Sequence, residues 1–97
     1  MKATLYLEIS CSEGTITLAA DTSLDFVPPD GMCIDVGDKD FPVTSTYYSI
    51  PSATLMVLLD GYRFETKDDV VREAEIWTNE DDGEGTLHWR IHDTHME

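Results

Sequence analysis

The chain has 97 residues, which is enough for one small domain built around a single hydrophobic core. Twenty acidic residues against six basic ones give a formal charge of -14 at pH 7. A surface this negative repels DNA, RNA and anionic membranes and attracts basic proteins, so the charge argues against direct nucleic-acid and membrane partners.

The N-terminal segment carries no signal-peptide pattern, because Glu8 interrupts its apolar residues, and no apolar run is long enough to span a membrane. We therefore expect a cytoplasmic protein. In a reducing compartment Cys11 and Cys33 are expected to be free thiols, with Cys11 in the core and Cys33 exposed.

The first 20 residues read as a β-hairpin. Apolar and polar residues alternate over 3–11 and again over 16–20, with a turn at 12–14 between them. The two prolines in 22–31 predict a loop, which Leu24, Phe26 and Val27 would anchor to the core.

Three further strands are expected in the middle of the chain. The first begins at Met32, and the other two cover 43–50 and 54–59. The pair Asp60-Gly61 predicts a tight turn that folds 62–64 back onto the preceding strand. A short helix over 52–59 is the alternative that we rank second.

One helix is predicted, over about 67–78. Thr66 begins a capping-box pattern, and an apolar stripe follows at Val70, Val71, Ala74 and Trp77. A last strand would then bury Leu87, Trp89 and Ile91, with His88, Arg90 and His92 facing away, and the tail at 94–97 would be frayed.

These elements predict a single compact domain over residues 1–97 with a small α+β fold. We expect a bent antiparallel sheet, or partial barrel, of five to six short strands, with the amphipathic helix before the last strand.

The acidic residues of the helix and of the loop after it are the main candidate site. Four carboxylates fall within five residues at the C-terminal end of the helix, where the helix dipole disfavours them, so helix stability does not explain their placement. A solvated loop is one interpretation and a docking surface for a basic partner is the other. The predicted partner-binding residues are Asp68, Asp69, Glu73, Glu75, Glu80, Asp81, Asp82 and Glu84.

Exposed tyrosines are the second candidate. Tyr6 should lie on the face opposite the core, and one of Tyr47 and Tyr48 must do the same. Exposed aromatic rings can anchor a protein interface, although ordinary cross-strand packing is the alternative.

Catalytic and metal-binding patterns are weak. The acidic segments 35–40 and 78–89 do not match a calcium loop, and Arg90 separates His88 from His92 on one strand face. No nucleophile motif is present. We predict no catalytic residue, no metal site, no cofactor and no enzymatic activity.

Three functions remain. The first is a small acidic binding module that inhibits or blocks a basic partner. Phage anti-defence proteins and nuclease-immunity proteins have this size and charge. Such a module would mimic nucleic acid. The second is an assembly subunit that forms a homo-oligomer through a sheet edge or the tyrosine surface. The third is a barrel that binds a small ligand.

Overall fold

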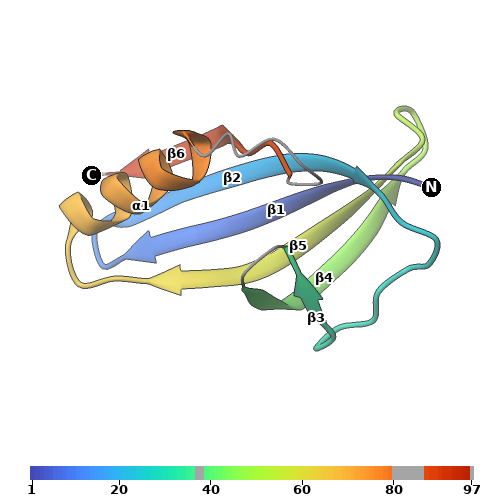
Figure 1. The fold of residues 1–97 in the computed structure, drawn as a ribbon, viewed down its shortest axis with the longest axis horizontal. Helices are drawn as coiled ribbons and strands as arrows, with labels where there is room; N and C mark the ends of the chain where they lie inside the picture. The colour runs from blue at the N-terminus through green and yellow to red at the C-terminus, as the bar shows by residue number, and fades with distance from the viewer. Residues whose placement is uncertain (37–38, 80–86, 97) are drawn as a thin grey trace.

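The computed structural model describes residues 1–36, 39–79 and 87–96. These residues form one sheet of six strands and one helix (Figure 1). The elements, in chain order, are β1 (Lys2–Cys11), β2 (Gly14–Ser23), β3 (Cys33–Asp35), β4 (Asp40–Ser49), β5 (Thr54–Arg63), α1 (Lys67–Asn79) and β6 (Arg90–Met96).

The strands lie in the order β3-β4-β5-β1-β2-β6, and the sheet is not closed. The α+β class, the strand number and the helix before the last strand are therefore confirmed. The sheet is mixed, however, because β1 and β5 pair in parallel at its centre whereas the other neighbours are antiparallel. The strands of the described residues therefore form an open sheet and not a closed barrel.

Alternation in β1 and β2 produces the core, because every second residue of a strand points to the same face. Leu5 faces Ala20 and Leu7 faces Leu18 across the pair, and all four side chains are buried. On the other side of β1, β5 adds an equally buried row. The residues that these three strands contribute to the hydrophobic core are Ala3, Leu5, Leu7, Ile9, Ile16, Leu18, Ala20, Leu55, Val57 and Leu59.

Loop 24–32 and α1 supply further side chains to this core. Pro28 is fully buried and Leu24 packs against the core, whereas Phe26 and Val27 are exposed. The prediction that Phe26 and Val27 anchor the loop is therefore wrong. The rigid ring of Pro28 is the fully buried side chain of this loop instead.

Thr66 caps α1, since its hydroxyl oxygen accepts a hydrogen bond from the Asp69 amide at 3.2 Å. The predicted helix is confirmed. Val70 and Ala74 are buried, but Val71 is exposed on the opposite flank and does not belong to the packed stripe. The stripe is narrower because a single sheet face covers only one side of the helix.

The expected turn at Asp60-Gly61 is not formed, because β5 continues through both residues to Arg63. The register of β5 against β1 shifts between Glu8 and Ser10, so Gly61 lies in a β-bulge. A Cβ atom at Gly61 would overlap the backbone carbonyl oxygen of Glu8. The glycine therefore permits close approach of two strands and does not reverse the chain.

β6 runs to Met96 and pairs with β2, so the strand extends into the segment 94–97 that we expect to be frayed. The register of β6 against β2 shifts between Thr17 and Leu18. Trp89 is buried as expected, but Ile91 is 53% exposed. Ile91 pairs with buried Leu18, as the alternation predicts, but β6 is the edge strand of the sheet of described residues and has no neighbouring strand on its outer side. Among the described residues, no helix is long and apolar enough to cross a membrane.

Candidate interaction surfaces

Six acidic residues lie at the end of the molecule where α1 begins, and we call this set the acidic end. β1 and β5 both point to this end, and the β1–β2 turn and the first turn of α1 lie there as well (Figure 1). Glu8 and Asp60 are direct neighbours across β1 and β5. The acidic end consists of Glu8, Glu13, Asp60, Glu65, Asp68 and Asp69.

A groove of about 520 Å³ opens at the acidic end. Glu8 and Glu65 line it together with Arg63, whose neighbour across the sheet is Ser10. The groove therefore presents two carboxylates and one guanidinium group, and its lining also includes Phe64 and Cys11. This arrangement suits a charged side chain of a partner better than an apolar ligand.

The helix acids that we predicted as one patch do not share one face. Asp69 forms an ion pair with Arg72 at 3.7 Å, and Glu73 accepts a hydrogen bond from the Trp77 indole at 3.2 Å. Asp68 and Glu75 are exposed. The two first-turn residues belong to the acidic end, whereas Glu73 takes part in packing.

The other predicted partner-binding residues, Glu80, Asp81, Asp82 and Glu84, lie outside the described residues. Their role stays a prediction. Glu8, Glu13, Asp60 and Glu65 were missed, because they are far apart in sequence and only the parallel pairing of β1 with β5 unites their ends.

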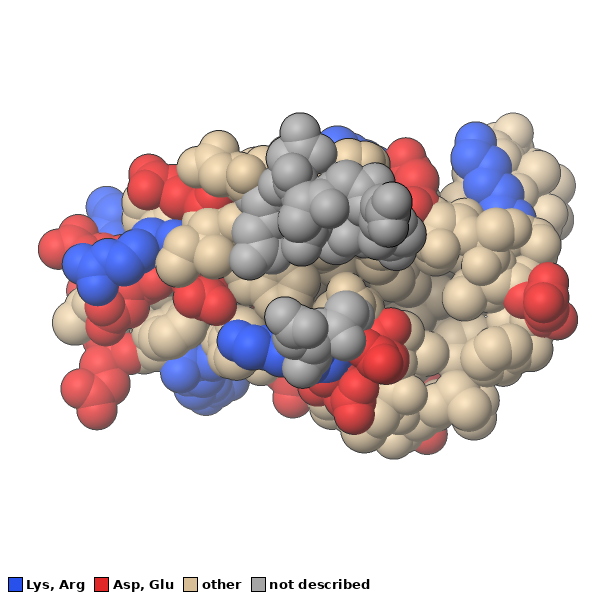
Figure 2. Space-filling view, viewed as in Figure 1, with Lys and Arg blue, Asp and Glu red and all other residues tan. Residues whose placement is uncertain are grey.

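Charge is unevenly distributed over the face that Figure 2 shows. Acidic side chains occur around the outline of this view, and they are densest at the end where α1 begins, interleaved with Lys and Arg (Figure 2). Uncharged side chains predominate at the opposite end (Figure 2). The carboxylates are thus not confined to one side, but the two ends of the molecule differ in character.

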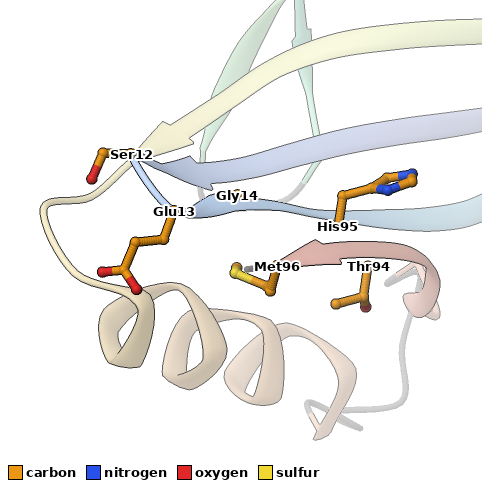
Figure 3. A pocket seen from close by; sticks show the side chains of 6 residues that line it. All are labelled: Ser12, Glu13, Gly14, Thr94, His95 and Met96. Carbon is orange, nitrogen blue, oxygen red and sulfur yellow. The ribbon is translucent and has the colours of Figure 1, made fainter.

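A second groove, of about 470 Å³, lies between the β1–β2 turn and the end of β6 (Figure 3). Glu13 points toward the side of α1, whereas the His95 imidazole points away from the helix (Figure 3). His95 is instead bound to Asp93, with 2.7 Å between Nε2 and Oδ2. The polar groups of this groove do not converge on a common point, which a ligand site would require.

The three tyrosines lie on two faces of the sheet. Tyr47 is paired with Met56 and belongs to the face opposite the core, together with Tyr6. Tyr48 is paired with buried Leu55 and lies on the other face. Tyr47 and Tyr48 are each 53% exposed, and Tyr6 is half-buried. The prediction that one of Tyr47 and Tyr48 faces away from the core is confirmed.

Tyr6 lies in a polar cluster on the face of the sheet opposite the core, which we call the open face. Its ring contacts the edge of the His92 ring at a centroid distance of 4.9 Å. Partial burial raises the pKa of Tyr6 above its ordinary value, and nearby Tyr47 raises it further while Arg90 opposes this effect. Tyr6 therefore stays a neutral hydroxyl-bearing ring that could contribute to an interface.

The remaining candidates show no convergence. Among the described residues, no group of three His, Cys, Asp or Glu side chains is placed to hold a metal ion. Cys11 is half-buried against the core and Cys33 is exposed, and the structure has both as free thiols, as predicted.

The sequence matches no known protein family. No curated protein and no solved structure matches it either.

Proposed function

We propose that the protein is a small acidic binding module that occupies a basic surface of another protein, of the kind that otherwise holds nucleic acid. The observation that carries this proposal is the acidic end, where strand ends, a turn and a helix start place six acidic residues at one end of the molecule. The net charge of -14 attracts such a partner over a distance, and the clustered carboxylates provide the contact.

The physical basis is competition with phosphate. A basic groove that binds nucleic acid offers Lys and Arg side chains at the spacing of phosphates, and carboxylates can accept the same hydrogen bonds. The bound module would then exclude DNA or RNA from the groove. Inhibition of this type needs no chemistry from the module itself.

The test starts with capture from an extract of the native host on immobilised protein, at low and at moderate salt. Each captured protein is then purified, and its binding to the module is measured with and without competing DNA. The proposal predicts a basic, nucleic-acid-handling partner whose binding weakens with salt and which DNA displaces. Partners that bind equally well in the presence of excess DNA would contradict it.

A pair of matched variants shows whether the acidic end makes the contact. The first replaces Glu8, Glu13, Asp60 and Glu65 with Gln or Asn, and the second replaces Asp25, Asp30, Asp35 and Asp40, which are also exposed, in the same way. Each variant loses four negative charges and so carries -14 + 4 = -10. Weaker binding by the first variant alone is the expected result, and equal losses would leave only a general charge effect.

A further inference from the structure

The β4–β5 hairpin stands out because charged residues occur only near the outer ends of its two strands. Residues 41–59 contain no Asp, Glu, Lys, Arg or His, although charged residues make up 27% of the chain. This run covers most of β4, the turn, and the part of β5 that precedes Asp60. A chain that carries -14 elsewhere thus keeps one long segment neutral.

One edge of this hairpin is open. β3 pairs with β4 only as far as Pro42, and the Val43 backbone bonds to Gly31 and Met32 complete the contact. Among the described residues, the backbone of 44–49 is paired only with β5. Alternate residues of an antiparallel edge strand direct their N–H and C=O groups outward, so this segment offers a row of groups for another strand.

The side chains along this edge are of the type that favours strand pairing. They are Thr, Ser and Tyr residues, and Tyr47 and Tyr48 present their rings on the two faces of the strand, each 53% exposed. Ile50, at the turn, is 82% exposed. Figure 1 shows that the turn between β4 and β5 projects beyond the neighbouring strands, at the same end as the N-terminus. Residues 44–49 include no charged residue and no proline, which are the residues that commonly protect a sheet edge against pairing with another strand.

We propose that two copies of this chain associate through β4, with residues 44–49 of each copy pairing antiparallel about a two-fold axis. The two six-stranded sheets then form one continuous sheet. Backbone hydrogen bonds supply the contact, and the tyrosine rings of the two copies pack across the join.

The lack of charge along residues 44–49 favours a second copy of this chain as the partner strand at the β4 edge. Two molecules that each carry -14 repel one another, and they approach most easily where neither has a carboxylate. The β4 edge meets this condition over its whole length. A basic partner would gain no ion pair along 44–49, so its binding surface lies elsewhere.

The other long edge of the sheet is less suitable. β6 carries Arg90, His92, Asp93 and His95 within seven residues. Antiparallel pairing of two β6 strands would have to remove water from the Arg90 and Asp93 side chains of both copies, which costs free energy that the uncharged edge of β4 avoids. The structure therefore favours β4 over β6 for self-association.

Sedimentation of the full chain at low and high micromolar concentration, in low and in high salt, tests the proposal. We expect a dimer that strengthens with salt, because salt screens the repulsion between the two copies. This dependence has the opposite sign to that of the acidic end with a basic partner, so the two proposals succeed or fail separately. A monomer at every concentration and salt level would overturn the dimer.

Tyr47→Lys is the decisive variant. It lowers the net negative charge, so general repulsion decreases, yet it places a cation of each copy at the join. The dimer dissociation constant should rise by about tenfold or more. Ile91→Lys on β6 is the matched control, because Ile91 has the same exposure of 53%, and its dimerisation should be unchanged. Equal behaviour of the two variants would contradict a β4 interface.

Amide hydrogen exchange of the unmodified chain provides a measurement that needs no variant. At high protein concentration alternate amides in 44–49 should become protected, whereas amides of β6 should not. If protection instead appears in β6, or does not depend on concentration, the assignment to β4 is wrong.

Discussion

Arg90 of β6 holds Asp21 of β2 through both guanidinium nitrogens, with Nη1 to Oδ2 and Nη2 to Oδ1 each at 3.4 Å. The same carboxylate accepts a hydrogen bond from the Thr4 hydroxyl of β1 at 2.9 Å. One aspartate thus links three neighbouring strands on the open face of the sheet. Its charge state should therefore influence how firmly β6 is attached.

Replacing Asp21 by Asn should destabilise the protein slightly at neutral pH. The Thr4 hydrogen bond lowers the pKa of Asp21, and Arg90 lowers it further against the effect of partial burial. A carboxylate with a depressed pKa contributes stability above its unfolded pKa and loses it as the pH falls through the folded value. Because the pair is more than half exposed, the contribution stays below about 1 kcal/mol.

Denaturant unfolding of Asp21→Asn at neutral and at strongly acidic pH checks this expectation. The difference from the unmodified protein should shrink as the pH falls. Asp25→Asn, at an exposed position, is the control and should show no such trend. A loss that is the same at both pH values would rule out a role for the charge.

Trp89→Ala should be among the most damaging single substitutions. Trp89 is buried just before β6, and its ring meets Trp77 of α1 edge to face at a centroid distance of 5.3 Å. Loss of this ring removes the packing between the helix and the last strand and should cost about 3–5 kcal/mol of unfolding free energy. Ile91→Ala, at an exposed site, should cost about 0.5 kcal/mol or less. Denaturant midpoints measure both, and similar costs would mean that Trp89 is not a core residue.

Gly61→Ala should destabilise the centre of the sheet. The added Cβ would overlap the Glu8 carbonyl oxygen, so β1 and β5 would have to separate at the bulge. We expect a loss of about 1–3 kcal/mol, as for other overpacked positions. Ser52→Ala in the exposed turn is the control. A melting temperature for Gly61→Ala equal to that of the control would show that the strands have room to adjust.

The close pair of carboxylates in the acidic end should weaken the fold at low salt. Glu8 and Asp60 lie opposite one another across β1 and β5, and like charges in this position repel. Asp60→Asn should therefore raise the melting temperature in low salt, by an amount that corresponds to about 0.2–1 kcal/mol. The gain should disappear in high salt, and a gain independent of salt would point to another cause.

Local patterns were sufficient to predict most of the elements. The alternation of apolar and polar residues predicts the strands around Leu5, and the capping pattern at Thr66 predicts the start of the helix. These signals are short-range, so neighbouring residues alone can carry them.

The errors came from long-range pairing. The parallel contact of β1 with β5 joins segments about 50 residues apart, and it changes the role of Gly61 from turn to bulge. It also brings Glu8 beside Asp60, which no local pattern indicates. Of the six residues of the acidic end, only Asp68 and Asp69 could therefore be predicted from the sequence.

The most direct test of the proposed function is the association rate of the captured partner with the two matched variants, measured over a range of salt concentrations. Since both carry -10, long-range attraction is equal, and any difference reports on where the carboxylates lie. The account predicts slower association and a flatter salt dependence for the variant of Glu8, Glu13, Asp60 and Glu65. Indistinguishable rates for the two variants would contradict it.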